Sequence, residues 1–328
     1  MTDSAASDQD KLVASAWQDQ ALWSAVANEL GDSIRRWRVG AAVAAVLGLF
    51  LTVLAGTLVN ADWQHRRGQL TLLGVLLLAL VPYVRQKMLA PERLQAWVRA
   101  RNVSELLKEA IYRHLMGATA IADSAAPAGS AGASGGLTRR CREIKQAAAD
   151  LARLAAAVTP AQRERKLRLS LADYLQERVE GQISYYKKCG EQAGRTARRL
   201  HAAEFVLGLA AVGLGALSGQ DLPAELGAHL TEQLAGQAQR VSWLLPWLTL
   251  VATAATAVTA HLAAARHDEL ASRYFATYDL IKSQRDEWLQ RPGHDAADQV
   301  RGFVNEIERT ISSENGAWVT DWNKANSG

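Results

Sequence analysis

Residues Val241–Ala264 read VSWLLPWLTLVATAATAVTAHLAA, a run of 24 residues without aspartate, glutamate, lysine or arginine. A helix needs about 20 predominantly apolar residues to cross the roughly 30 Å hydrocarbon core of a bilayer. Three other apolar stretches complete two pairs, at Val39–Val59, Leu70–Val84 and Ala202–Ser218. The pattern predicts an all-α integral membrane protein with two transmembrane helical hairpins, and so four spans, that carry long cytosolic helical extensions.

Basic residues bracket these stretches, as is typical of the cytoplasmic ends of membrane helices. They are Arg35, Arg36, Arg38, Arg85, Lys87, Arg195, Arg198, Arg199 and Arg266. We therefore expect a multi-pass protein of the inner (cytoplasmic) membrane, with both termini cytosolic and the two inter-span loops outside. Arg66 and Arg67, in the first loop, oppose this orientation. The alternative, a soluble bundle with unusually apolar hairpins, is disfavoured by the uncharged run.

Composition divides the chain along its length. Residues 118–137 consist almost entirely of Ala, Gly and Ser, which predicts a flexible linker. The linker separates residues 1–117 from residues 138–328, and each part reads as helix, span, loop, span, helix. In the second part we expect Thr159 and Pro160 to start the long helix that leads into the third span. Glu204, near the cytosolic end of that span, is expected to reach lipid headgroups or to pair with Arg198 or Arg199.

The sequence contains no pattern typical of an enzyme, such as HExxH, GxxxxGK[ST] or GxSxG. The seven histidines are scattered, and Cys141 and Cys189 share no metal-binding spacing. We expect no catalytic residues, no metal, no cofactor and no nucleic-acid partner.

Small residues recur along the first and third spans and allow helices to approach closely in lipid. They are Gly40, Ala44, Gly48, Thr52 and Gly56 in the first span, and Gly208, Ala211, Gly215 and Ser218 in the third. These ridges predict either an oligomer interface or packing within one protomer. In the fourth span Ser242, Thr249, Thr253 and Thr256 fall on one helix face. That hydroxyl stripe either bonds neighbouring helices or lines a wetted path.

Three stretches of the second half carry a family resemblance. They are YLQERVEGQISYYKKCGEQAGRTARRLHAAEFVLG, HLAAARHDELASRYFATYDLIKSQRDEW and FVNEIERTISSENGAWVTDW. These stretches resemble the SLATT family, the SMODS- and SLOG-associating two-transmembrane effector domains of bacterial conflict systems. In the first half, AWVRARNVSELLKEAIYRHLMG resembles another SLATT subfamily. The resemblance therefore implies two SLATT units in tandem.

The residues that match the family pattern all lie in the predicted cytosolic helices. They are Trp97, Arg101, Glu105, Lys108, Tyr174, Arg178, Gln182, Tyr185, Tyr186, Glu269, Tyr274, Glu314, Asn315 and Trp318. The resemblance implies an oligomeric effector that perturbs or permeabilises the bilayer in antiphage defence, triggered by a nucleotide second messenger or a sensor protein. The alternative is a membrane scaffold or adaptor whose cytosolic bundle docks a partner.

Overall fold

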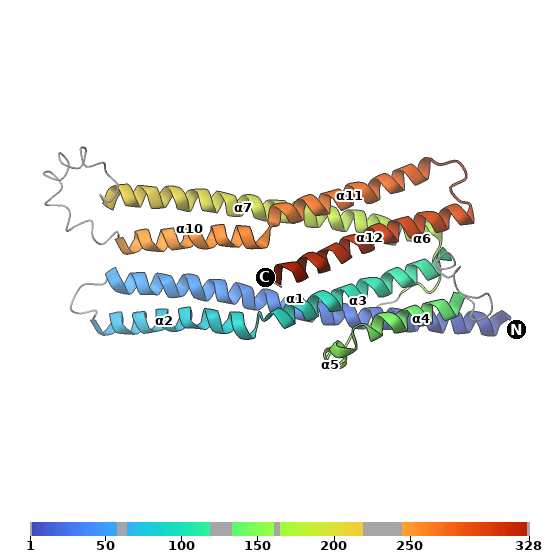
Figure 1. Ribbon diagram of the computed structural model, residues 1–328, viewed down its shortest axis with the longest axis horizontal. Helices are drawn as coiled ribbons and strands as arrows, with labels where there is room; N and C mark the ends of the chain where they lie inside the picture. The colour runs from blue at the N-terminus through green and yellow to red at the C-terminus, as the bar shows by residue number, and fades with distance from the viewer. Residues whose placement is uncertain (1, 58–63, 119–132, 161–164, 219–244, 327–328) are drawn as a thin grey trace. The chain divides into compact units, whose positions relative to one another are not determined.

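The structure is a computed structural model that describes residues 2–57, 64–118, 133–160, 165–218 and 245–326. Within these ranges every regular element is a helix, in agreement with the all-α prediction. The elements are α1 (Thr2–Thr57), α2 (Gln64–Lys87), α3 (Pro91–Leu115), α4 (Ala133–Gln146), η3 (Ala149–Leu151), α5 (Ala152–Ala156), α6 (Leu171–Tyr174), η4 (Leu175–Val179), α7 (Glu180–Ser218), α10 (Leu245–Ala265), α11 (His267–Gln290) and α12 (Ala297–Asn326) (Figure 1).

The described chain forms two compact units, and each unit draws on both halves of the sequence. The first, called here the bundle unit, comprises Met1–Arg35, Ala90–Cys189 and Arg273–Gly328. The second, called here the span unit, comprises Arg36–Leu89 and Gly190–Ser272. The compact units are thus distinct from the two sequential parts, 1–117 and 138–328, which stay a prediction about repeated organisation.

The span unit holds the apolar stretches. Two helices of the described chain are long and apolar enough to cross a bilayer, within Ser7–Thr57 of α1 and at Arg66–Lys87 of α2. In α10 the apolar stretch is shorter, at Pro246–Thr259. The structure therefore supports membrane helices in the first hairpin, and the four-span topology stays a prediction. Most of both predicted outside loops, at 58–63 and 219–244, lies outside the described residues.

The two hairpins share one pattern of connections. α1 and α7 each run without a break from the bundle unit into the span unit. The return helices are interrupted: α2 ends at Lys87 and α3 begins at Pro91, while α10 and α11 are separated by Arg266 alone. Arg266 has φ of 46°, in the left-handed region that residues with a Cβ seldom adopt. Each hairpin is therefore entered by a continuous helix and left through a joint.

The core of the bundle unit lies where α3 packs against α4 and α12. The N-terminal part of α1 contributes Trp23, Val26 and Ile34, which recur at helical spacing and are buried. The rings of Trp17 and Tyr112 meet edge-on, with centroids 5.6 Å apart. α3 ends where Gly117 takes φ of 65°, which lets its backbone N–H reach back to the carbonyl of His114.

Two predicted boundaries were wrong. Helix α4 begins at Ala133, inside the stretch expected to be a flexible linker, because Leu137, Cys141 and Ile144 form an apolar face that the core buries. Residues 119–132 of that stretch lie outside the described residues.

The second wrong boundary is the start of the helix that leads into α7. Ser170 caps it rather than the Thr159–Pro160 pair: its hydroxyl accepts from the backbone N–H of Asp173, whose carboxylate accepts from the backbone N–H of Ser170. This capping box satisfies two backbone donors at once.

Candidate functional site

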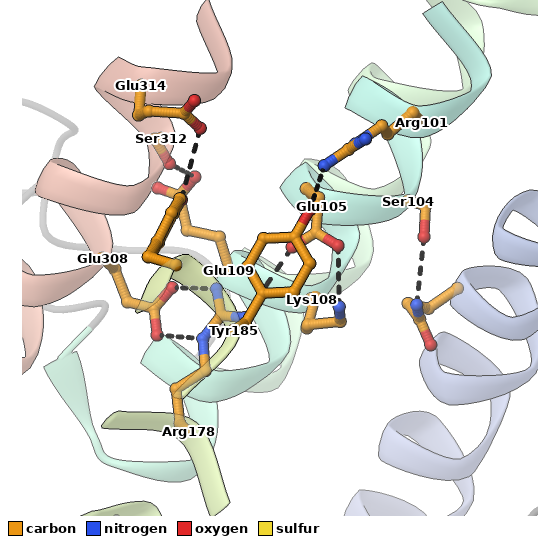
Figure 2. A network of polar contacts seen from close by, with 12 residues as sticks. Arg101, Ser104, Glu105, Lys108, Glu109, Arg178, Tyr185, Glu308, Ser312 and Glu314 are labelled. Atoms are coloured by element: carbon orange, nitrogen blue, oxygen red, sulfur yellow. Dashed lines mark hydrogen bonds and ion pairs between the residues drawn. The ribbon is translucent and has the colours of Figure 1, made fainter. Parts of the chain in front are cut away.

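A buried ion pair lies at the centre of the bundle unit, between Arg178 and Glu308. The Arg178 Nε and Nη2 donate to the two carboxylate oxygens of Glu308 at 2.9 and 2.7 Å (Figure 2). The two side chains are only 2% and 0% exposed. Tyr174 donates its hydroxyl to the same carboxylate at 3.2 Å. Glu308 is thus held by three hydrogen bonds in a water-excluded setting.

Local backbone geometry helps to place Arg178. It lies in η4, a single π-helical turn between α6 and α7. Such turns are rare and occur frequently at functional sites, because the extra residue per turn redirects the side chains that follow. The capping box at Ser170 and Asp173 fixes the start of this segment. Beside it, the guanidinium of Arg178 lies over the ring of Tyr112, 5.1 Å from its centroid.

Charges on α3 extend the pair into a network. Glu105 lies 3.7 Å from Nη1 of Arg178, and Lys108 donates to Glu105 at 2.7 Å. Burial alone would raise the pKa of Glu105, but Lys108 and Arg178 together lower it. Burial disfavours the charge on Arg178 as well, yet the adjacent Glu308 outweighs it and raises the pKa of Arg178. Both groups therefore stay charged at neutral pH.

A second branch of the network is rich in tyrosine. Arg101 donates to the hydroxyl of Tyr185 at 2.7 Å, and Tyr186 donates to Glu314 at 3.2 Å. The rings of Tyr185 and Tyr186 meet edge-on, and Tyr274 lies against Tyr186 with ring centroids 6.2 Å apart. Burial raises the pKa of Tyr185 to about 12 and also raises the pKa of Glu314. Burial also raises the pKa of Tyr186 and of Tyr274, so the tyrosines are neutral at physiological pH.

Two further contacts join helices within the bundle unit. Ser312 on α12 donates to Glu109 on α3 (Figure 2), and Glu109 also pairs with Arg113 at 2.9 Å. Gln20 on α1 donates to Ser104 on α3 at 3.0 Å. Polar contacts of this network thus connect α3 to α1, to the start of α7 and to α12.

The chemistry of this network is electrostatic cross-linking. Its members are guanidinium, ammonium, carboxylate and phenol groups, paired with one another. Within the described ranges no three His, Cys, Asp or Glu side chains come together as metal ligands. Burial raises the pKa of Cys141 to about 11, so its thiol is protonated and unreactive. The arrangement is suited to holding the helices of the bundle unit in one register. Breaking a buried ion pair would allow that register to change.

The network unites most of the predicted family-pattern residues. Those that it joins are Arg101, Glu105, Lys108, Tyr174, Arg178, Tyr185, Tyr186, Tyr274 and Glu314. Gln182 is half-buried on α7 and is not among them. Trp97 lies instead against α1, where a Cβ on Gly31 would come 2.8 Å from its indole nitrogen. Glu269 belongs to the span unit and pairs with Arg266 at 3.5 Å. The side chains of Asn315 and Trp318 lie outside the described residues.

Sequence reasoning missed the acidic partners Glu308 and Glu109. A signal for Glu308 was present, because it falls four residues after Val304 and three before Ile311 on the apolar stripe of α12. A charge at a core position of an amphipathic helix needs a buried partner. Arg178 supplies that partner from 130 positions away, a distance along the chain that no local pattern reveals.

In the span unit, the predicted small-residue positions behave differently from one another. A Cβ on Gly48 would come 2.8 Å from the carbonyl oxygen of Gly74, so at this position α1 lies close against α2 within the chain. Ala44 and Gly215 are buried. Gly40, Gly56 and Gly208 have open space where a Cβ would extend.

Three residues of the predicted hydroxyl stripe lie on α10, and the fourth, Ser242, lies outside the described residues. Thr249, Thr253 and Thr256 are exposed, and Thr256 donates to the carbonyl of Ala252 at 3.0 Å. Thr259, next to the stripe, donates to Glu204 at 2.6 Å. Glu204 also lies 3.6 Å from His201, so its partners are Thr259 and His201 rather than the predicted Arg198 or Arg199.

Comparison with known proteins identifies one domain. Residues 224–318 match the family model SLATT_1, described as SMODS and SLOG-associating 2TM effector domain 1. The match supports the SLATT resemblance in the second half of the chain and, with the apolar helices, indicates a membrane-associated effector. It does not extend to the first half, so the tandem arrangement stays a prediction. No curated protein and no solved structure matches the chain.

Proposed function

We propose that this protein is an oligomeric effector of the inner membrane that permeabilises the bilayer when its bundle unit receives a signal. The observation that carries the proposal is the continuity of α1 and α7. Each is a single helix with one end in the bundle unit, which holds the polar network, and the other end in the span unit. A change in the bundle unit is therefore transmitted to the spans along unbroken backbone.

Exposed apolar side chains support the membrane part of the proposal. Val46 on α1 and Leu72 on α2 are 64% and 61% exposed, and Phe205 and Val212 on α7 are 70% and 71% exposed. Large apolar side chains exposed in this way are unfavourable in water and match the hydrocarbon core of a bilayer. We propose that all four apolar helices contact lipid, with both termini and the bundle unit in the cytosol.

The repeated pattern of connections supports two SLATT-like units in tandem. Each unit would supply one continuous helix, α1 or α7, and one return helix with a joint, at 88–90 or at Arg266. Joints of this kind are where a hairpin can change its packing, while the continuous helix keeps its register. The proposed trigger is a nucleotide second messenger or a sensor protein, and the proposed partners are lipid and further copies of the chain.

The executing step can be tested in the fourth apolar stretch. Replacing Thr253 and Thr256 together with valine keeps the β-branched shape and removes the hydroxyls. If the stripe borders a wetted path, the double variant inserts and assembles but no longer depolarises triggered cells, because an apolar constriction closes by dewetting. The measurement is a membrane-potential dye in cells that express the protein with its neighbouring genes.

The matched control is Thr277→Val on α11. Thr277 donates to the carbonyl of Arg273 at 3.1 Å, the same backbone contact that Thr256 makes, but it belongs to the bundle unit. This control should depolarise as the native protein does. Full depolarisation by the assembled double-valine variant assigns the stripe to helix packing, and absence of depolarisation under every trigger favours the scaffold alternative.

A further inference from the structure

A half-open pocket in the bundle unit lies beside α1 and outside the network described above. Its volume is about 380 Å³, near the lower end of the 300–1,000 Å³ that is typical of small-molecule sites. One wall is a face of α1 that includes Gln18, Ser24 and Asn28, separated by alanines. Pro160, Arg165 and Leu167 contribute from the segment that precedes α6.

Among the described residues that line the pocket, Arg165 is the only charged one, and none is an Asp or Glu. Residues 161–164, between Pro160 and Arg165, lie outside the described residues. The Arg165 guanidinium is stacked over the indole of Trp17, 4.9 Å from the ring centroid. A guanidinium over an aromatic face still has its N–H groups available for hydrogen bonds. Within the described ranges Arg165 forms no ion pair, whereas the neighbouring Arg168 lies 3.3 Å from Asp10.

Uncharged polar groups complete the lining. Gln18 and Asn28 are exposed amides that can both donate and accept hydrogen bonds, and Ser24 adds a half-buried hydroxyl. Trp17 is 6% exposed, and its indole N–H has no hydrogen-bond partner among the described residues. Buried donors are normally satisfied, so an unpartnered one in the wall of a cavity indicates a missing acceptor.

We propose that this pocket is a binding site for a small organic anion, whose phosphate or carboxylate pairs with Arg165 while its polar body contacts Gln18, Ser24 and Asn28. The inference rests on the proposed function in one respect, because it gives the proposed trigger a place to bind. A lining whose described residues include one arginine and no carboxylate favours an anion over a cation or a neutral sugar. The small alanines on α1 leave room for the body of the ligand.

The pocket is electrostatically linked to the buried network. Burial is the main cause that lowers the pKa of Lys108, and the charges of Arg178 and Arg165 lower it further. An anion on Arg165 would therefore favour the charged form of Lys108, which holds Glu105 beside Arg178. Occupancy of the pocket thus acts on the same ion pairs that join α3 to α12.

The test is calorimetric titration of the full-length protein in detergent with three probes. Adenosine 5′-monophosphate carries a planar base and a phosphate, glycerol 3-phosphate represents a lipid headgroup, and inorganic phosphate is the anion alone. We expect saturable binding of one of the two organic phosphates with Kd below about 1 mM. The organic phosphate with the higher affinity shows whether the ligand resembles a nucleotide or a lipid headgroup. Absence of saturable binding by both, or equal affinity for inorganic phosphate, would overturn the proposal.

Variants assign the binding to this pocket. Arg165→Gln should weaken the organic phosphate by about tenfold or more, because a charge-assisted hydrogen bond is lost. Arg168→Gln is the matched control and should bind as the native protein does. Ala25→Leu should reduce binding by filling the cavity. Native affinity in Arg165→Gln overturns the assignment. Binding is measured without opening a membrane, so its failure is distinguishable from a failure of permeabilisation.

Discussion

Arg178 and Glu308 are 130 positions apart in the chain, yet they form a two-point ion pair that is almost fully removed from water. The pair joins the π-helical turn ahead of α7 to the middle of α12. Removing one member of a buried pair leaves the other charge uncompensated, which is more harmful than removing both. The two residues of the pair therefore stabilise the bundle unit as one energetically coupled unit.

The first prediction concerns the ion pair between Arg178 and Glu308. Glu308→Leu and Arg178→Met should each lower the free energy of unfolding by about 3–5 kcal/mol. The double replacement should cost clearly less than the sum of the two, because neither charge is then left unpaired. Thermal unfolding of the four proteins in the same detergent gives the coupling energy.

An exposed pair on α7 provides the control for that cycle. Arg195 lies 3.5 Å from Glu191, with 53% and 44% of the two side chains exposed. Arg195→Ala should change stability by less than about 1 kcal/mol, since solvent screens the attraction. Additive effects of the Arg178 and Glu308 replacements would contradict the proposed coupling between the two residues.

The second prediction concerns pH and two carboxylates of the network. Burial raises the pKa of Glu314 above its ordinary 4.5, so the stability that it contributes is present below pH 4.5 and is lost as pH rises through the folded-state pKa. Glu314→Gln should abolish that loss. The variant should therefore gain stability relative to the native protein as pH rises from 4.5 through the folded-state pKa of Glu314.

Glu105 provides the opposite sign. Although burial acts to raise its pKa, Lys108 and Arg178 lower it overall, so its contribution is present above 4.5 and is lost as pH falls through the folded-state pKa. Glu105→Gln should lower the stability at neutral pH and reduce the fall in stability that the native protein shows as pH is lowered. Unfolding midpoints over a pH series provide the measurement, and the same sign of pH dependence for both variants would contradict the assignment.

The third prediction concerns the first hairpin. Gly48→Ala should loosen it, because the new Cβ would lie 2.8 Å from the carbonyl oxygen of Gly74. Overpacking of this kind costs roughly 1–3 kcal/mol. Gly40→Ala, with open space at its Cβ, should be neutral or stabilising. Thermal unfolding compares the variants, and light scattering reports particle mass. A smaller Gly48→Ala particle with unchanged stability would instead assign the ridge to an oligomer interface.

The fourth prediction concerns topology. A cysteine at Ser283, an exposed position on α11, should be protected from a membrane-impermeant maleimide in intact cells, whereas one at Glu225 should react. The background should carry Cys141→Ala and Cys189→Ser, which remove the native thiols. Labelling at 283 from outside would reverse the proposed orientation.

Much of the helical architecture followed from the sequence because its signals are local. The apolar run at Val39–Val59 has about the length that a bilayer requires and the run at Leu70–Val84 is shorter, and helices long and apolar enough to cross lie within Ser7–Thr57 and at Arg66–Lys87. On α1, Trp23, Val26, Leu30, Ile34 and Trp37 recur at helical spacing, and the structure buries Trp23, Val26 and Ile34 while Trp37 is 39% exposed. The start of α4 was missed because its composition resembles a linker, while its burial depends on α3 and the rest of the core.

The sequence by itself determined which stretches are helical and which are too apolar for water, since both properties depend on residues within one or two turns. Only the tertiary structure decided that Arg178 meets Glu308, that Gly48 faces Gly74, and that a pocket forms beside Trp17 and Arg165. Each of these depends on segments far apart in the chain. A charge at a buried position predicts that a partner is needed, but the tertiary structure determines which residue is that partner.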